Sequence, residues 1–204
     1  MAYKTLTKAI LVAGLAISAT SAMAADGPKL KMGASDSMLA NTCAGCHGTN
    51  GISQGPAAPT ISGLSNDYFV EVMQGFASGE VQSTIMGRIA KGYTEGEIVQ
   101  LAKFYVALPF EKAVQEFDPK LAKKGAKLHD KYCEKCHAEG GQSAEDDAGV
   151  MAGQWTPYTN WQLSNFQAGG REAPKKMKKK MEKMLAKEGS VGIEALLNFY
   201  ASQK

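Results

Sequence analysis

Apolar side chains recur at helical spacing along much of the chain. Tyr68, Val72 and Phe76 lie on one face of a helix over residues 67–76, because positions about four apart share a helical face. The same spacing predicts three further helices, over residues 95–106, 158–166 and 193–201. Alternating apolar and polar positions, which are typical of a half-buried strand, are scarce. We therefore expect an all-α fold.

The first 24 residues have the pattern of a secretory signal peptide. Lys4 and Lys8 precede a short apolar run over residues 9–17, and the triplet Ala-Met-Ala follows at positions 22–24. A membrane-spanning helix needs roughly 20 apolar residues, and neither this run nor any later stretch approaches that length. We expect residues 1–24 to be removed on export, and the remaining chain to be secreted, soluble and not membrane-spanning.

The exported part of the chain contains an internal repeat. A shift of 90 positions, without a gap, aligns three glycines and two aromatic residues of the first half with identical residues of the second. Near the ends of the halves the shift becomes 95, which indicates an insertion of five residues. We interpret the repeat as a tandem duplication of one domain. The predicted domains are residues 25–108 and 121–204, and residues 109–120, with a proline near each end, form the linker.

Each half carries one Cys-x-x-Cys-His motif. Residues i, i+3 and i+4 share one face of a helical turn, so two thiols reach the vinyl groups on one porphyrin edge while the imidazole meets the iron. The motifs are formed by Cys43, Cys46 and His47 in the first half and by Cys133, Cys136 and His137 in the second. This spacing predicts covalent attachment of heme c in each half.

Other interpretations of a Cys-x-x-Cys pair fit less well. A single motif also occurs in redox dithiols and in zinc sites, and exported cysteines often form disulfides. Here two motifs stand at matching places in a repeat and use all four cysteines of the chain. A disulfide framework would leave both motif histidines unexplained. Two covalently bound hemes are therefore the prediction.

Each heme iron needs a second axial ligand on its opposite face. His129 precedes Cys133 by only four residues, so we expect it on the surface or beside a heme propionate. Met86 follows His47 by 39 residues in a loop-like stretch and is the predicted ligand of the first iron. A methionine raises the reduction potential relative to a second histidine. Met73 belongs to an apolar helical face and is expected to pack in the core.

The second half offers three methionines at helical spacing, Met177, Met181 and Met184. The shift of 90 carries Met86 to the residue before Met177, whereas the shift of 95 carries it to Met181. We favour Met177 because the first shift also aligns the heme motifs, and Met181 remains the alternative. Met151 follows the second motif too closely and is expected to pack.

The charge balance argues against a nucleic-acid partner. The formal charge of +3 includes the two lysines of the signal peptide, and without them 21 basic side chains face 20 acidic ones. Nucleic-acid binding is typical of strongly basic domains.

If both irons carry two protein ligands, no site is open to a substrate, and electron transfer is the expected role. Catalysis, as in a diheme peroxidase or a thiosulfate-converting cytochrome, would need a displaceable ligand.

Three stretches, of which the first surrounds Met86, carry a family resemblance. They are residues 84–93, with the sequence TIMGRIAKGY, residues 152–155, AGQW, followed by Tyr158, and residues 199–202, FYAS. These stretches carry the resemblance, which extends over nearly the full length of the exported chain. The chain resembles the diheme cytochrome subunit of flavocytochrome c sulfide dehydrogenase. It is more loosely similar to diheme cytochrome c4. That protein has an Ala-Gly-Gln element in both halves, whereas the first half here has Ser62, Gly63 and Leu64.

The resemblance implies a bacterial periplasmic complex of two cytochrome c domains with a separate FAD-containing subunit. That subunit oxidises sulfide and passes electrons to the hemes, which pass them to a soluble or membrane-bound acceptor. This chain has no Gly-x-Gly-x-x-Gly sequence and gives no sign of binding FAD itself. It is then not an enzyme by itself. The alternative is a free diheme carrier of the cytochrome c4 type that delivers electrons to a terminal oxidase.

A cluster of lysines follows Pro174. It is either a docking surface for an acidic redox partner or the solvated face of an amphipathic helix, and we favour the second interpretation. Its members are Lys175, Lys176, Lys178, Lys179, Lys180 and Lys183.

Overall fold

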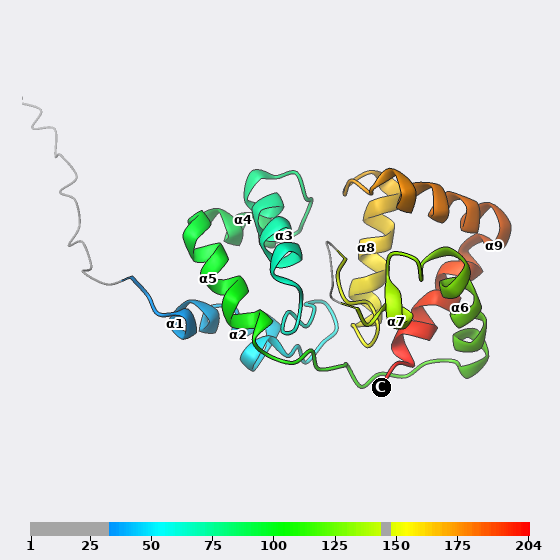
Figure 1. Ribbon diagram of the computed structural model, residues 1–204, viewed down its shortest axis with the longest axis horizontal. Coiled ribbons are helices and arrows are strands. Elements are labelled where there is room, and N and C mark those ends of the chain that lie inside the picture. Colours follow the sequence, from blue (N-terminus) through cyan, green and yellow to red (C-terminus); the bar gives the residue numbers. More distant parts are fainter. Residues whose placement is uncertain (1–32, 144–147) are drawn as a thin grey trace, which may run out of the picture. The chain divides into compact units, whose positions relative to one another are not determined.

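The described residues of the computed structural model, 33–143 and 148–204, form helices and no strand, which confirms the all-α prediction (Figure 1). The expected signal peptide, residues 1–24, lies outside the described residues. The first half contains α1 (Asp36–Asn41), α2 (Ala44–His47), the 3-10 helix η1 (Thr49–Gly51), α3 (Asn66–Ser78), α4 (Met86–Ile89), the 3-10 helix η2 (Ala90–Gly92) and α5 (Glu95–Val106). The second half contains α6 (Pro119–Tyr132), α7 (Ala138–Gly141), α8 (Thr156–Ala168) and α9 (Lys175–Ala201).

Polar side chains close the first turns of the longer helices. The hydroxyl of Ser65 accepts from the N–H of Tyr68 at the start of α3, and Thr94 and Glu97 form a reciprocal capping box at the start of α5. Asp118 accepts from two backbone N–H groups of α6, whose first residue is a proline. These caps satisfy donors that have no partner within the helix, and so they fix where each helix begins.

The structure repeats the duplication that the sequence predicts. The bounds of α3 and α8 differ by 90 positions, whereas α5 and α9 end 95 positions apart. Backbone hydrogen bonds repeat as well. The N–H of Gly63 donates to the carbonyl of Tyr105 at 3.0 Å, and the N–H of Gly153 donates to the carbonyl of Tyr200 at 2.8 Å. The two halves are therefore tandem copies of one helical domain.

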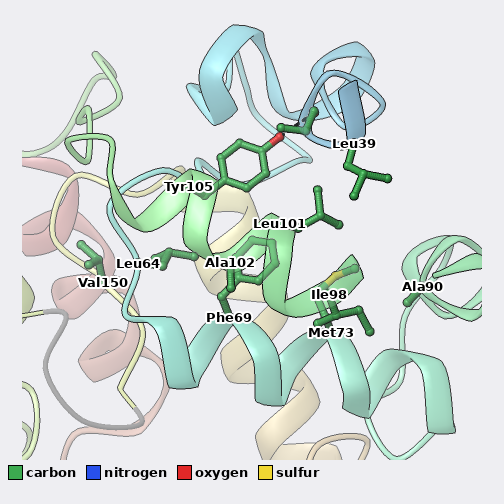
Figure 2. Packing of buried hydrophobic residues seen from close by; sticks show 11 residues of the cluster. Leu39, Leu64, Phe69, Met73, Ala90, Ile98, Leu101, Ala102, Tyr105 and Val150 are labelled. Atoms are coloured by element: carbon green, nitrogen blue, oxygen red, sulfur yellow. Dashed lines mark hydrogen bonds between the residues drawn. The ribbon is translucent and has the colours of Figure 1, made fainter. Parts of the chain in front are cut away.

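The core of the first half lies where α1, α3 and α5 meet (Figure 2). Phe69 and Met73 of α3 pack with Leu101 and Tyr105 of α5, and the rings of Phe69 and Tyr105 stack at 5.7 Å between centroids. Met73 is 7% exposed, so its predicted role as a core residue is confirmed. Burial of this kind of side chain contributes about 1.5–3 kcal/mol per residue.

The core of the second half is built mainly by the crossing of α6 and α9. Leu128 and Tyr132 of α6 pack with Met184 and Leu196 of α9. The helices approach closely at Gly125, where a Cβ atom would overlap the backbone carbonyl of Ala195. This crossing holds α6 in place directly before the second Cys-x-x-Cys-His motif.

Helix α9 is interrupted at Gly189. This residue has φ 61° and ψ −155°, a combination that glycine adopts almost exclusively. The segment before the break contains the lysine cluster with Met177 and Met181, and the segment after it packs in the core. The sequence predicted a helix over residues 193–201 and favoured an amphipathic helix for the lysine-rich segment, but it did not predict that the two form one interrupted helix. Although α9 is long, no helix in the described ranges is apolar enough to cross a membrane.

Residues 109–118 have no regular secondary structure and connect α5 to α6. The segment forms hydrogen bonds with the second half at several positions. The N–H of Ala113 donates to the carbonyl of Gly153 at 2.7 Å, and the N–H of Asp118 donates to the side-chain oxygen of Asn198 at 2.7 Å. Pro119 and Lys120, the last two residues of the predicted linker, already belong to α6.

Candidate heme sites

The first motif forms a single helical turn. Cys43 stands before α2, and its carbonyl accepts from the N–H groups of Cys46 at 3.2 Å and His47 at 2.9 Å. His47 is 8% exposed, whereas the two cysteines are half-buried and exposed, respectively. The turn presents two accessible thiols beside a buried imidazole, as the motif requires.

The imidazole of His47 is held in one tautomer. Its Nδ1 lies 2.8 Å from the carbonyl oxygen of Pro59. A carbonyl oxygen can only accept, so Nδ1 carries the proton and Nε2 has a free lone pair. Burial lowers the pKa of His47, although the bond to Pro59 partly opposes this effect. The ring is therefore neutral near pH 7, with Nε2 able to bind a metal.

The second motif repeats the same turn after α6. The carbonyl of Cys133 accepts from the N–H groups of Cys136 at 3.1 Å and His137 at 3.0 Å. Burial lowers the pKa of His137, and the nearby His129 lowers it further. Unlike His47, His137 has a buried Nδ1 with no hydrogen-bond partner among the residues that the structure describes. The two candidate iron ligands therefore differ in their surroundings.

The four cysteines fit heme attachment better than they fit the other chemistries of a Cys-x-x-Cys pair. All four are free, so neither pair is a disulfide. Burial raises the pKa of Cys133 to about 11, whereas redox dithiols depend on a lowered thiol pKa. Within the described part of the chain, no three His, Cys, Asp or Glu side chains gather as a metal-binding group. Two free thiols followed by a neutral imidazole fit covalent heme c in each half.

The methionines occupy three kinds of environment. Met86, the first residue of α4, is half-buried against the first core. Met177 and Met181 are both half-buried on α9, so burial does not separate these two candidates, and the preference for Met177 stays a prediction. Met184 is 1% exposed in the second core. Met151 packs against the same core, as predicted.

The expectation that His129 lies on the surface is wrong, and its alternative position beside a heme propionate stays a prediction. Its side chain is fully buried, with Nδ1 at 3.0 Å from the hydroxyl of Tyr200 and Nε2 at 2.7 Å from the carboxylate of Glu134. The ring of Phe199 packs against it. The physical reason is helical spacing, because His129 lies four residues after a buried glycine and next to Leu128 on the inward face of α6.

Residues of the second half bind the backbone of the first half. The side chain of Gln154 forms two hydrogen bonds with the backbone of Thr60, and the indole N–H of Trp155 donates to the carbonyl of Ser53 at 3.2 Å. The sequence marked Gln154 and Trp155 only as part of a resemblance. It gave no signal for Ser53 or Thr60, because each contributes backbone atoms to these bonds.

All six members of the lysine cluster are exposed. Among the described residues, the side chains of five of the six have no ion pair or hydrogen bond, and the ammonium of Lys180 approaches the carbonyl of Lys131 at 3.4 Å. The neighbouring pair Lys124 and Glu188 joins α6 to α9 at 3.0 Å. The exposure fits both interpretations of the cluster.

Two tandem helical domains with a Cys-x-x-Cys-His turn in each form the two-domain cytochrome c fold. The structure of reduced cytochrome c4 from Pseudomonas stutzeri has this fold, with a TM-score of 0.69 and 24% sequence identity, and the match covers 85% of this chain and all of that one. At this identity the likeness concerns the fold alone. No family model matches the chain.

Two curated relatives carry more specific names. The chain is 44% identical over 68 residues to the cytochrome subunit of sulfide dehydrogenase from Chlorobaculum tepidum, a match covering 33% of this chain and 61% of that subunit. It is 28% identical over 161 residues to the thiosulfate dehydrogenase electron acceptor of Stutzerimonas stutzeri, covering 74% of each chain. The chain is therefore similar to a cytochrome subunit of a sulfide dehydrogenase and to an electron acceptor of a thiosulfate dehydrogenase.

Proposed function

We propose that this chain is a periplasmic diheme cytochrome that accepts electrons from the FAD subunit of a sulfide dehydrogenase and passes them to a downstream acceptor. In each half, one Cys-x-x-Cys-His turn holds a heme covalently. The proposed thioether residues are Cys43, Cys46, Cys133 and Cys136, and the proposed axial ligands are His47 with Met86 and His137 with Met177.

One observation carries the heme assignment. The two motif turns, at positions related by the duplication, repeat the same pair of backbone hydrogen bonds and both present free cysteines. A heme iron supplies reversible one-electron chemistry, so two such sites match the two electrons of a reduced flavin. Burial keeps both imidazoles neutral. Methionine on the opposite side favours the reduced state relative to a second histidine.

The sulfide dehydrogenase assignment is supported by the 44% identical stretch and by the resemblance around Met86 and Gln154. On this proposal the flavin belongs to the partner, and the chain is an electron-transfer subunit without catalysis of its own. Export by the predicted signal peptide brings the chain to the periplasm, where its cysteines meet heme.

Heme content and partner binding are measured separately. Alkaline pyridine spectra of the native preparation should give two hemes c per chain, and a Cys43→Ala and Cys46→Ala double variant should retain one. Purification from the source cells should yield a flavoprotein at equal stoichiometry, and sulfide should reduce both hemes of that complex. A native monomer that never carries flavin and is not reduced by sulfide with any cellular flavoprotein would refute the sulfide dehydrogenase assignment while leaving the heme assignment intact.

A second candidate is a free diheme carrier of the cytochrome c4 type. It is favoured by the longer match to a thiosulfate dehydrogenase electron acceptor, which covers 74% of the chain. Such a carrier would be a monomer that thiosulfate dehydrogenase reduces in the presence of thiosulfate. A catalytic role requires a displaceable distal ligand, and a reduced spectrum that carbon monoxide leaves unchanged would rule it out.

A further inference from the structure

The peptide group that joins Pro59 to Thr60 lies between the imidazole of His47 and the side-chain amide of Gln154. Its carbonyl oxygen accepts from Nδ1 of His47 at 2.8 Å, and its N–H donates to Oε1 of Gln154 at 3.0 Å. The two bonds use opposite ends of one conjugated group. A side chain of the second half is thus connected, through a single peptide of the first half, to the candidate iron ligand of the first half.

This connection is buried and fixed in orientation. Gln154 is 4% exposed, Thr60 1% and His47 8%. The side-chain nitrogen of Gln154 also donates to the carbonyl of Thr60 at 2.9 Å, so the side chain binds both the N–H and the carbonyl of Thr60. The N–H of Trp155 donates to the same Oε1 at 3.1 Å. If the oxygen and nitrogen of the Gln154 side chain were exchanged, the N–H groups of Thr60 and Trp155 would both face an NH₂ group, which cannot accept.

Hydrogen bonds in series strengthen one another when they are buried. A donor bond from the Thr60 N–H to Gln154 increases the negative charge on the Pro59 oxygen, which then accepts more strongly from Nδ1 of His47. A stronger bond at Nδ1 makes Nε2 a better electron donor to a metal. Better donation stabilises the oxidised iron and lowers its reduction potential.

The described residues of the second half lack this arrangement. In the duplication, Leu64 corresponds to Gln154 and Val150 corresponds to Thr60. Both Leu64 and Val150 are buried in the core of the first half (Figure 2). The side chain of Leu64 has no amide group that could accept a hydrogen bond and polarise a peptide. The counterpart of His47 is His137, whose Nδ1 has no partner in the described part of the structure. The two halves therefore differ at both ends of this chain of bonds, at the histidine and at the position of Gln154.

We propose that Gln154 is a positioning residue for His47, and that through the Pro59–Thr60 peptide it lowers the reduction potential of the heme in the other half. The proposal rests on the proposed heme function, but not on the identity of the electron donor. The second half thereby sets a property of the first, and the two hemes acquire different potentials although their attachment turns match.

The test compares Gln154→Leu and Gln154→Met with wild type, by potentiometric titration of the holoprotein. Leucine is the residue that the first half has at this position, and methionine keeps the length of glutamine without its amide. The potential of the heme at His47 should rise in both variants, whereas that at His137 should stay unchanged. A Met86→Ala variant identifies which potential belongs to which heme.

Trp155→Phe is the matched control. It removes another hydrogen bond between the halves, from the indole to Ser53, without touching the Pro59–Thr60 peptide. Equal rises in Trp155→Phe and the Gln154 variants would mean that a looser interface causes the shift, and would overturn the proposal. So would unchanged potentials in folded Gln154 variants, or equal shifts of both hemes.

Proton exchange provides a second measurement that reports on the bond itself. The Nδ1 proton of His47 should exchange up to about twofold faster in the Gln154 variants, because its bond to Pro59 is weakened by about 10–30% and not lost. In wild type it should exchange more slowly than the Nδ1 proton of His137. The opposite order in wild type would overturn the proposal even if no variant folds. Absence of heme from the purified chain would instead refute the proposed function.

Discussion

The hydroxyl of Tyr200 lies 3.0 Å from Nδ1 of His129 inside the second core, whereas the equivalent Tyr105 donates to the backbone carbonyl of Ala40 at 2.8 Å. Each tyrosine ties the last helix of its half to the helix before the Cys-x-x-Cys-His turn. The two anchors occupy matching positions of the duplication but use different partners. Their loss should therefore have different consequences.

Tyr200→Phe should destabilise the holoprotein by about 1–3 kcal/mol, because it leaves the buried Nδ1 of His129 without this partner. Tyr105→Phe should cost less, about 0.5–1.5 kcal/mol, because the carbonyl of Ala40 still accepts from the N–H of Cys43. Urea unfolding of both variants measures the difference. A smaller loss in Tyr200→Phe than in Tyr105→Phe would contradict this account of His129.

Gly125→Ala should lower the free energy of unfolding by about 1–3 kcal/mol or more, since the added methyl group overlaps the carbonyl of Ala195 and pushes α6 away from α9. Gly96→Ala in α5 is the control, because a Cβ there meets nothing within 4 Å. That control should gain up to about 1 kcal/mol from helix propensity. Thermal unfolding of the two variants should give shifts of opposite sign.

Methionine variants test the distal ligands. Met86→Ala and Met177→Ala should each remove about half of the sulfur-to-iron absorption band near the red end of the oxidised spectrum. Met181→Ala should keep the band whole. Met73→Ala, the core control, should also keep it, while it loses about 2–5 kcal/mol of stability from its cavity. Loss of the band in Met181→Ala with its retention in Met177→Ala would reverse the assignment in the second half.

The capping box of α5 should make stability depend on pH on the acid side. Hydrogen bonds from Thr94 lower the pKa of Glu97, so Glu97 contributes stability above its unfolded pKa, and this contribution is lost as pH falls through the lower folded value. Glu97→Gln still accepts from Thr94 but does not titrate, so its stability should fall less than that of wild type between neutral and acid pH. Glu95→Gln, outside the capping box, should follow wild type more closely.

The lysine cluster can be tested by charge reversal. If the cluster steers an acidic redox partner, replacing Lys175, Lys176 and Lys179 with Glu should slow electron transfer at low salt, and the difference should vanish at high salt. Lys103→Glu on α5 of the first half is the control. Rates that the reversal leaves unchanged at low salt would establish the cluster as a solvated helix face.

The helices and the motif turns followed from local patterns in the sequence. Helical spacing gave α3, α5 and α8 nearly to their ends, and the Cys-x-x-Cys-His spacing gave the two turns because five adjacent residues determine them. His129 was misjudged because its closeness to Cys133 was weighed before its position on the inward face of α6. That face was readable from Gly125 and Leu128.

Contacts over long sequence separations were not accessible in the same way. Gln154 binds Thr60 across 94 positions, and the bonds use backbone atoms of Thr60 that every residue except proline possesses. No pattern of side chains reports such a contact. The break in α9 was missed for another reason, since the lysine-rich segment and the apolar segment were each compatible with a helix and Gly189 alone separates them.

The backbone angles of Gly189 also limit how the two halves can diverge from each other. A side chain there would meet no atom within 4 Å, yet the conformation itself excludes other residues. The five additional residues of the second half lie between positions 170 and 192, in the segment that this glycine ends. Any other residue at position 189 would strain this conformation, so the break between the lysine-rich segment of α9 and its core segment depends on this glycine.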